Sequence, residues 1–378
     1  MDFSLAEEQQ AVRDLALQIM TEQAPPEHLK ALEAADDAAG TFDAALWSAL
    51  AEAGLLGIAL PEDVGGADLD FVALCQIVEV AGLTAAYVPV VETLVSAADT
   101  INRFGTDDQK AAWLPQIASG ELIATAATAE LVGDVVVPGL DAPATIARST
   151  GDGFTLTGVK ACVPSGLRAS LLLIPASIEG GGVGVFLVDA SSVTTEAQEG
   201  PARREALVTL DSATVSADRL LGGSGADGAA IIASMVLRTT AALCALEAGV
   251  VTSAVKLGAE YTSEREQFEK KIATFQAVGQ RMADAYVDAE AIRLTASQAV
   301  WRISEGEEAL DAVAIAKFWA AEGGQRVVHA ATHVHGGVGV DRDYPLHRFF
   351  LLTRQIELTL GGATQSLLAL GARAAASA

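Results

Sequence analysis

This 378-residue chain is poor in cysteine and in positive charge, and it has no long uncharged apolar run. Its three cysteines, Cys75, Cys162 and Cys244, stand alone in apolar surroundings without CxxC spacing. That pattern argues against a disulfide framework and against a cysteine-based zinc site, and we expect all three in the core.

Positive charge is scarce, because 24 lysines and arginines face 49 aspartates and glutamates, for a formal net charge of −25. Such a field repels nucleic acid and anionic lipid, which makes both classes of partner unexpected. An anionic cofactor or substrate would need a local group of arginines.

Membrane spans are not expected, although the mean hydropathy is +0.35. Much of the apolar content is alanine, and no uncharged run approaches the ~20 residues of a spanning helix. The first residues are acidic and helical in pattern rather than basic and followed by a cleavage site. We therefore expect a cytoplasmic protein.

Helical and β-rich texture alternate along the chain. Residues 1–120 carry helical periodicity, 121–222 carry short β-rich runs between glycine turns, and 223–378 return to long helical patterns. The pattern predicts a helical domain, a small antiparallel β domain and a helical bundle, in that order. The expected helices are 5–19, 44–53, 69–81, 230–264, 274–305, 309–335 and 355–376, and the expected β runs are 145–163, 170–176 and 183–190.

One segment, residues 264–276, combines Arg265, Phe268 and Gln276 at fixed spacing and reads as a nucleotide clamp. Further on, Gly336 and Gly337 would let backbone lie close to a phosphate chain. The histidines near them, His333, His335 and His347, have no carboxylate or cysteine to complete a metal ligand set, so no metal is expected.

Four runs in one order resemble the acyl-CoA dehydrogenases across essentially the whole chain: residues 60–82, 104–121, 264–276 and 333–339. The resemblance implies an α+β, mostly α fold with an N-terminal helical domain (1–120), a β-barrel-like middle domain (121–222) and a C-terminal four-helix bundle (223–378). It also implies FAD as cofactor, an acyl-CoA substrate and an electron-transfer flavoprotein as acceptor. In that chemistry a glutamate removes the α-proton while a hydride passes from the β-carbon to the flavin, giving an enoyl-CoA.

The residues that the family contributes across the subunit interface are retained. Arg265 matches the arginine on the flavin diphosphate of the neighbouring subunit, and its planar fork suits phosphate oxygens. Two departures are His333, where glutamine is usual, and Glu269, where glycine usually follows the phenylalanine. By this resemblance the cofactor-binding residues are Arg265, Gln267, Phe268, Gln276, His333, Gly336 and Gly337.

The positions that a subunit uses for its own flavin are changed. Gly133 and Asp134 remain in the middle-domain loop, but the usual serine between them is absent. Cys162 and Pro164 stand where the family has tryptophan and a hydroxyl residue. In residues 358–365 the usual Glu-Gly-Thr reads Gly362, Ala363 and Thr364, so Thr364 remains as a cofactor contact and the glutamate base is missing.

No other carboxylate takes the place of that base by position. Some members place it near the start of the long helix before the clamp, where this chain has Arg238, Thr239 and Thr240. The nearest candidate, Glu247, lies about two turns further along, since a turn takes ~3.6 residues, and Glu357 meets a similar objection. We therefore assign no catalytic residue.

We expect a base-lacking partner subunit of a heteromeric α2β2 acyl-CoA dehydrogenase, as occurs in the family among enzymes of sterol side-chain breakdown. This heterotetramer would complete the FAD site of a second chain in trans, for sterol or fatty-acyl degradation. The alternatives are a homotetrameric acyl-CoA dehydrogenase with an unusual base, and a flavin-free acyl-CoA-binding scaffold.

Overall fold

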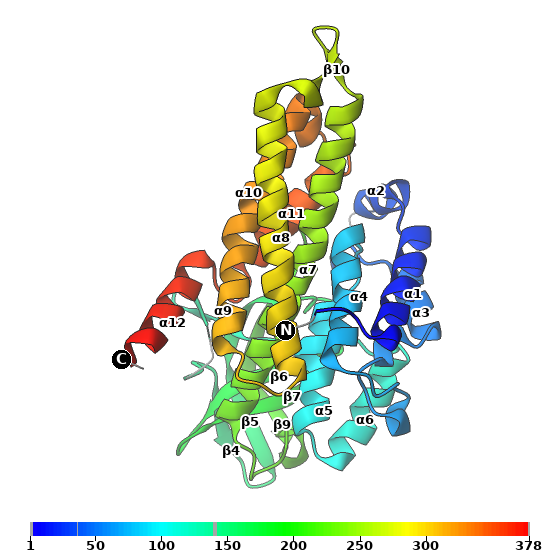
Figure 1. Cartoon of the computed structure of the whole chain (residues 1–378). Coiled ribbons are helices and arrows are strands. Elements are labelled where there is room, and N and C mark those ends of the chain that lie inside the picture. Colours follow the sequence, from blue (N-terminus) through cyan, green and yellow to red (C-terminus); the bar gives the residue numbers. More distant parts are fainter. Residues whose placement is uncertain (1–2, 36, 139–141, 377–378) are drawn as a thin grey trace. The chain divides into compact units, whose positions relative to one another are not determined.

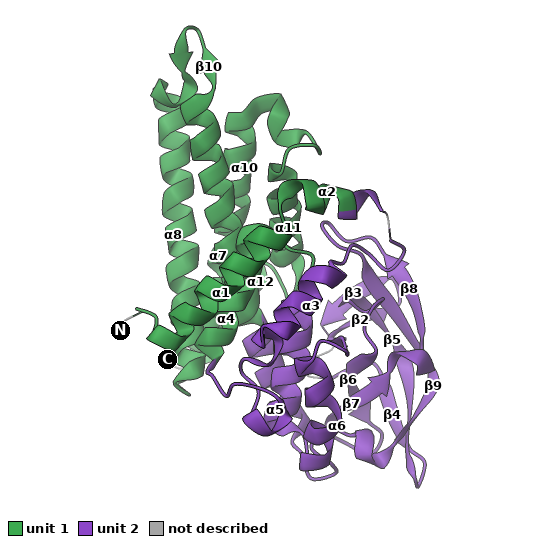
Figure 2. Ribbon diagram, turned by 90° about the vertical axis from the view of Figure 1, so that its right-hand side faces the viewer, with its two compact units in different colours: residues 1–31, 71–87, 240–378 green, residues 32–70, 88–239 purple. Residues whose placement is uncertain are grey.

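The computed structural model describes residues 3–35, 37–138 and 142–376, which divide into two compact units. Unit 1 comprises residues 1–31, 71–87 and 240–378, and unit 2 comprises residues 32–70 and 88–239 (Figure 2). Among the described elements, α6 ends at Ala118, β1 begins at Ala124, β9 ends at Ser216 and α7 begins at Gly228. The predicted boundaries thus fall between elements, while the three-domain division itself stays a prediction.

Unit 1 is a bundle of long helices (Figure 1). The amphipathic α1 and the apolar α4 pack on each other, and helices α8 to α12 follow α7 along the chain. The first part of α7, residues 228–239, and the end of α2, residues 32–34, belong to unit 2. A π-helical turn, η7, joins α9 to α10, so the predicted helix 309–335 is continuous but irregular. The elements are α1 Glu7–Gln23, α2 Pro26–Ala34, α4 Phe71–Thr84, α7 Gly228–Glu264, α8 Gln276–Ser304, α9 Leu310–Phe318, η7 Trp319–Gly323, α10 Gly324–His335, η8 Gly336–Val340, α11 Leu346–Leu358 and α12 Ala363–Ala376.

Helices α4 and α7 cross at two glycines, which lets their backbones touch. A Cβ on Gly82 would lie 2.1 Å from the carbonyl oxygen of Leu246, and one on Gly249 would lie 2.0 Å from that of Glu79. No side chain larger than hydrogen fits at either position. This crossing fixes the register of α7 in unit 1.

The predicted helix 355–376 is wrong, because the chain breaks inside it. Helix α11 begins at Leu346 and ends at Leu358, and α12 begins only at Ala363. Between them Leu360 has φ 58° and Gly361 has φ 96°, both in the left-handed region that ends a helix. The periodic apolar residues on either side concealed this break.

Unit 2 is built on a nine-stranded sheet in which strands β1, β6, β4, β5, β2 and β3 lie in that order. Most pairs are antiparallel, but β6 runs parallel to both β1 and β4, so the predicted purely antiparallel unit is corrected to a mixed sheet. The strands are β1 Ala124–Ala126, β2 Ala129–Val132, β3 Val135–Pro138, β4 Ile146–Ser149, β5 Gly153–Pro164, β6 Leu171–Ile178, β7 Val183–Asp189, β8 Thr194–Gln198 and β9 Glu205–Ser216.

Most helical elements of unit 2 precede the sheet in sequence, and several of them were not predicted. The short α3 was expected, whereas the capped helix α6 was seen only as a family motif. A π-helix, η3, precedes α5. These elements are α3 Ala44–Glu52, η1 Leu55–Gly57, η2 Glu62–Val64, η3 Val90–Asp99, α5 Thr100–Phe104 and α6 Asp107–Ala118.

A buried ion pair holds the middle of the sheet. Lys160 on β5 is fully buried and its Nζ lies 2.6 Å from Oε1 of Glu130 on β2. The ammonium also donates to the carbonyl of Pro175 at 2.7 Å, and the carboxylate accepts from the backbone and hydroxyl of Thr145. Both charged groups are therefore hydrogen-bonded to further partners besides each other. A buried ion pair is tolerated when its remaining hydrogen-bonding capacity is used in this way.

Cys162 corrects the expectation that all three cysteines are core residues, since it is exposed while Cys75 and Cys244 are buried. The register of β5 on β9 shifts between Lys160 and Val163, and Cys162 has φ 50°. The bulge turns its side chain outward, and its N–H donates to Oε1 of Gln198 at 2.7 Å.

Helix α7 is the one described helix long and apolar enough to cross a membrane by length and composition. In its most apolar 18-residue window, 61% of the residues are buried inside the protein. The core helix of a bundle has the same character.

Candidate functional site

One end of the unit 1 bundle carries the predicted clamp. There α7 and α8 are joined by a two-stranded hairpin, β10 Glu266–Gln267 and β11 Lys270–Lys271 (Figure 1, label β10). The turn consists of Phe268 and Glu269, with φ 51° and 61°. Two successive left-handed residues define the turn that suits a two-residue hairpin, where glycine or asparagine is usual.

Arg265 lies at the base of this hairpin, just after α7 ends. Its N–H donates to the carbonyl of Tyr261 and its carbonyl accepts from Ile272, each at 2.9 Å. The backbone is therefore fixed while the side chain is exposed. Gln267 and Gln276 are exposed as well, and Phe268 is 87% exposed.

The glycine turn begins where α10 ends. His333 lies exposed in the last turn of α10, and Gly336 follows with φ 63°. A Cβ built on Gly336 or on Gly337 would meet nothing within 4 Å, so open space borders the backbone there. A ligand can approach this main chain closely.

The segment 264–276 and the glycine turn at Gly336–Gly337, which together we call the clamp, lie at the same end of the bundle. A Cβ on Gly258 in α7 would lie 2.7 Å from the methyl group of Met282 in α8 and 3.8 Å from Cα of Ala331 in α10. The three helices therefore lie side by side at this height in the bundle. From that level α7 runs on to Arg265 and α10 to Gly336. The rings of Tyr261 and His335 stack at 4.3 Å, which ties the two ends together.

These residues have the chemistry to bind the phosphates that the resemblance leads us to expect. An exposed guanidinium and an open glycine backbone at the same end of the bundle offer a planar cation and accessible main chain, which phosphate oxygens can take as donors. No group of three or more histidine, cysteine, aspartate or glutamate side chains able to hold a metal lies among the residues described.

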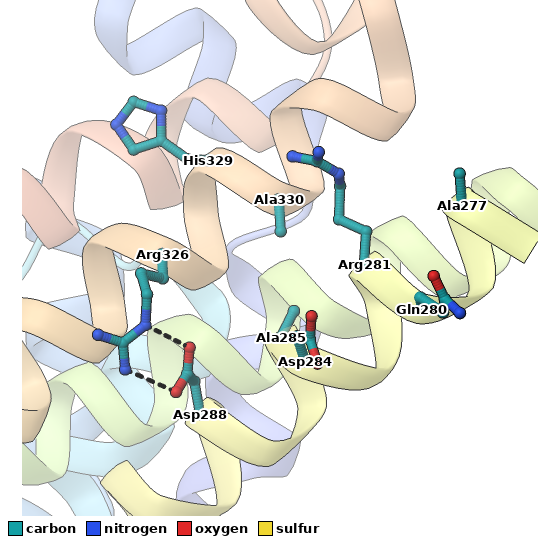
Figure 3. A pocket seen from close by; sticks show the side chains of 9 residues that line it. All are labelled: Ala277, Gln280, Arg281, Asp284, Ala285, Asp288, Arg326, His329 and Ala330. Carbon is teal, nitrogen blue, oxygen red and sulfur yellow. Dashed lines mark hydrogen bonds and ion pairs between the residues drawn. The ribbon is translucent and has the colours of Figure 1, made fainter.

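A groove of about 560 Å³ runs between α8 and α10 from the clamp end. Alanines at 277, 285 and 330 line it together with charged side chains (Figure 3). Nε and Nη2 of Arg326 hold the two carboxylate oxygens of Asp288 at 2.7 Å each. The remaining lining residues are Gln280, Arg281, Asp284 and His329.

Thr364 is not brought to the clamp. It lies exposed in the first turn of α12, beyond the far end of α11, whose 13 residues span about 20 Å. Before it, the N–H of Gly362 donates to Oε1 of Gln365 at 3.1 Å. Residues 359–364 therefore hold no carboxylate at the place of the family base.

In unit 2, the register at which the resemblance suggests an alternative base is occupied by an ion pair. Nε and Nη2 of Arg238 on α7 donate to the two carboxylate oxygens of Asp99, at 2.5 and 2.9 Å. Both side chains are 9% exposed. A guanidinium in this bidentate arrangement cannot accept a proton.

Glu247, the nearest alternative carboxylate, lies inside unit 1 with 0% exposure. Its Oε1 accepts from the Thr353 hydroxyl at 2.8 Å, while Oε2 lacks a partner among the described residues. Burial raises the pKa of Glu247 to about 8, offset in part by Thr353 and by the charge of Lys317. This carboxyl group belongs to the bundle interior.

Lys317 shares that interior. Its ammonium donates to the carbonyl of Ile356 near the end of α11, and burial lowers its pKa to about 8. Glu357, the other carboxylate considered, pairs instead with Arg354 one turn earlier on α11. Neither carboxylate is presented as an open base.

The middle-domain positions that the resemblance assigns to a chain's own flavin lie in unit 2, whereas Thr364 lies in unit 1. Gly133 and Asp134 form the turn between β2 and β3, with Gly133 at φ 61°. Cys162 and Pro164 lie on β5, and the carbonyl of Pro164 accepts from the hydroxyl of Thr125 at 2.8 Å. Proline leaves no hydroxyl or N–H at this position.

Sequence reasoning missed three aromatic residues beneath the clamp, Tyr261, His335 and Tyr344. His335 was considered only as part of a histidine cluster. An aromatic residue one turn before Arg265 and a histidine directly before the paired glycines are the signals that point to them.

Family models match most of the chain: the acyl-CoA dehydrogenase N-terminal domain over residues 6–121 and the C-terminal domain over residues 226–376. The acyl-CoA dehydrogenase FadE27 of Mycobacterium tuberculosis is 38% identical, with 98% of each chain covered. FadE28 of the same organism is 27% identical, with 99% of each covered.

Among solved structures, the ChsE4-ChsE5 complex from Mycobacterium tuberculosis matches with TM-score 0.91 and 37% identity. A variant of the Tcur3481-Tcur3483 steroid ACAD matches with TM-score 0.89 and 40% identity, and each comparison covers 99% of both chains. With its helical domain, central sheet and helical bundle in the predicted order, this chain belongs to the acyl-CoA dehydrogenase family.

Proposed function

We propose that this chain is the partner subunit of a heteromeric acyl-CoA dehydrogenase, which lends its clamp to the flavin of a second chain that carries the glutamate base. The observation behind the proposal is that residues suited to binding a nucleotide are present, whereas a residue suited to removing the α-proton is absent from both expected positions. Arg265, Gln276 and the Gly336–Gly337 backbone are exposed together at one bundle end, whereas no open carboxylate stands at either base position.

The side chains at the base positions support a second chain as the source of the base. Arg238 is engaged by Asp99 in a buried pair, and Glu247 is enclosed in the bundle. Flavin supplies hydride acceptance in this family, but removal of the α-proton needs a carboxylate next to the thioester. In the proposed enzyme that carboxylate comes from the second chain.

The chain's own contribution is binding. Arg265 neutralises diphosphate charge, Gln267 and Gln276 supply amide hydrogen bonds, and the glycine backbone admits the nucleotide. The groove between α8 and α10 begins one residue after Gln276 and is lined by three alanines among polar and charged side chains, so it could also receive part of the second chain. An electron-transfer flavoprotein would accept the electrons.

A steroid-linked acyl-CoA is the substrate class we propose. It is supported by the similarity to one chain of a steroid ACAD made of two different subunits. Those names describe the relatives, and the acyl pocket of the proposed enzyme would lie largely in the second chain.

The test is reconstitution with a second acyl-CoA dehydrogenase chain that carries the glutamate. Arg265→Ala should weaken flavin retention by the pair at least tenfold, because a charged hydrogen bond to phosphate is worth about 1.5–3 kcal/mol. Lys256→Ala removes an exposed cation about two and a half turns earlier on α7, away from the clamp, and should leave flavin retention unchanged. Equal flavin retention by all three proteins would contradict the proposal.

A further inference from the structure

The nucleotide clamp rests on an aromatic cluster formed by Tyr261, His335 and Tyr344. The imidazole of His335 stacks on the Tyr261 ring at 4.3 Å with an interplanar angle of 24°. The Tyr344 ring closes the cluster, 5.0 Å from His335 and 6.5 Å from Tyr261. Each ring comes from a different element: α7, α10 and the segment before α11.

The hydrogen bonds of His335 fix one tautomer of its neutral imidazole. Its Nδ1 lies 2.7 Å from the carbonyl oxygen of Ala331, which can only accept, so Nδ1 carries a hydrogen. Its Nε2 lies 3.1 Å from the Tyr344 hydroxyl. In the neutral imidazole that nitrogen accepts the phenolic hydrogen, and both ring nitrogens are satisfied.

The surroundings of the imidazole also favour the neutral form. His335 is 3% exposed, and burial lowers its pKa from the ordinary value of 6.5. The rings of Tyr261 and Tyr344 face the imidazole. His347 donates to the carbonyl of Tyr344 at 2.7 Å, and two carboxylates of α7, Glu260 and Glu264, lie near the Tyr344 side chain. Protonation of His335 would require the Tyr344 hydroxyl to turn and accept from Nε2, and it would place a positive charge in a buried site.

The cluster is joined directly to both parts of the clamp. Tyr261 lies one turn before Arg265, and its carbonyl accepts the N–H of Arg265 at 2.9 Å. His335 immediately precedes Gly336, whose left-handed conformation starts the glycine turn. A shift of either ring therefore moves the guanidinium relative to the open backbone.

We propose that Tyr261, His335 and Tyr344 are positioning residues that hold Arg265 and the Gly336–Gly337 backbone in one arrangement, and that His335 does so only as the neutral imidazole. This inference rests on the proposed function, since it concerns how the same clamp is kept ready for a flavin nucleotide. The clamp is thereby pH-sensitive through a buried side chain that does not touch the ligand.

The first experiment uses the chain alone, so it does not depend on flavin. Hydrogen exchange is measured on the amides of residues 261–265 and 336–340 in the wild type, Tyr261→Leu, His335→Asn and Tyr344→Phe. Tyr261→Leu and His335→Asn should speed exchange in both segments at least tenfold. Tyr344→Phe, which keeps the ring and removes one neutral hydrogen bond worth about 1 kcal/mol, should speed it about fivefold.

Unchanged exchange in Tyr261→Leu and His335→Asn overturns the inference, whatever the chain does with flavin. Faster exchange confined to the mutated segment also overturns it, because a positioning cluster must couple the two parts. If a variant loses its helical circular dichroism, Tyr344→Phe supplies the same comparison with a smaller change.

The second experiment titrates flavin into the reconstituted pair between pH 5.5 and pH 8. The wild-type dissociation constant should be level above about pH 6.5 and rise as the pH falls through the lowered pKa of His335. His335→Asn should be weak and level throughout. His333→Gln, made alone and with each variant, removes the exposed histidine of the clamp and isolates the effect of His335.

The two proposals fail in different ways. A wild-type pair that binds no flavin contradicts the proposed function, while the exchange data still decide the positioning role. A pair that binds flavin with the same pH dependence in wild type and His335→Asn contradicts the positioning role and leaves the proposed function standing.

Discussion

Gly324 lies directly against Glu247 in the interior of the bundle. A Cβ built on Gly324, the first residue of α10, would stand 2.3 Å from Oε1 and 3.1 Å from Cδ of Glu247, and 3.3 Å from Cγ2 of Thr353. The π-helical turn Trp319–Gly323 ends immediately before this glycine. The buried carboxyl group of Glu247 thus lies beside the point where the π-helical turn ends and α10 begins.

Gly324→Ala should destabilise the protein by about 2 kcal/mol, because an added methyl group in a filled core forces neighbours to move. Urea unfolding measures the change. Gly371→Ala, in α12 with nothing within 4 Å of its Cβ, is the matched control and should stabilise by up to about 1 kcal/mol. Adding Glu247→Ala should relieve part of the Gly324→Ala defect, whereas strictly additive effects would contradict the contact.

The Glu247 carboxyl group should make stability fall as the pH rises. Its pKa is about 8 in the folded chain and near the ordinary 4.5 when unfolded, so folding retains a proton that the unfolded chain releases. The stabilisation present below pH 4.5 is therefore lost as the pH rises toward 8. Glu247→Gln keeps an acceptor for Thr353 and cannot ionise.

Unfolding curves at pH 5 and pH 8 test this sign. Relative to the wild type, Glu247→Gln should gain stability at pH 8 and much less at pH 5. A constant difference between the two proteins at both pH values would mean that Glu247 does not titrate on unfolding.

Lys160→Met in the sheet of unit 2 should cost about 3–5 kcal/mol, because it leaves the Glu130 carboxylate buried without its cation. Thermal unfolding gives the size of the loss. Arg148→Met breaks the pair with Glu179, whose side chains are 56% and 62% exposed, and should change stability by no more than about 1 kcal/mol. Similar losses in both variants would contradict the role given to burial.

Glu269→Gly should stabilise the hairpin at the clamp by about 1 kcal/mol, since a side chain at φ 61° is strained and glycine is not. Exchange of the Ile272 amide, which donates to Arg265, should slow about fivefold. Lys270→Gly, at the adjacent strand position, should have the opposite effect. Faster exchange in Glu269→Gly would show that the glutamate side chain, not the turn, holds the hairpin.

Sequence patterns predicted most of the helices because their apolar residues recur with helical period, and the bounds of α7 and α8 agree within two residues. The break between α11 and α12 was missed although Gly361 and Gly362 are a turn signal, because the apolar periodicity on either side was given more weight. The parallel partners of β6 were also missed, since strand pairing joins segments distant in sequence.

The clamp residues could be singled out from the sequence because they lie in two short segments with distinctive spacing, and their role in binding stays a prediction. The aromatic cluster beneath the clamp could not be predicted in this way. Tyr261 and Tyr344 belong to no sequence motif with His335, and only the fold brings their rings together. The burial of Glu247 was likewise invisible, since one glutamate on an apolar helix face carries no mark of what α9, α10 and α11 place around it.

Flavin content measured with and without a second chain tests the central claim most directly. The purified chain alone should be colourless and inactive, and the pair with a glutamate-bearing acyl-CoA dehydrogenase chain should hold one flavin per pair and oxidise acyl-CoA. A yellow, active protein made of this chain alone, with one flavin per copy, would contradict the account.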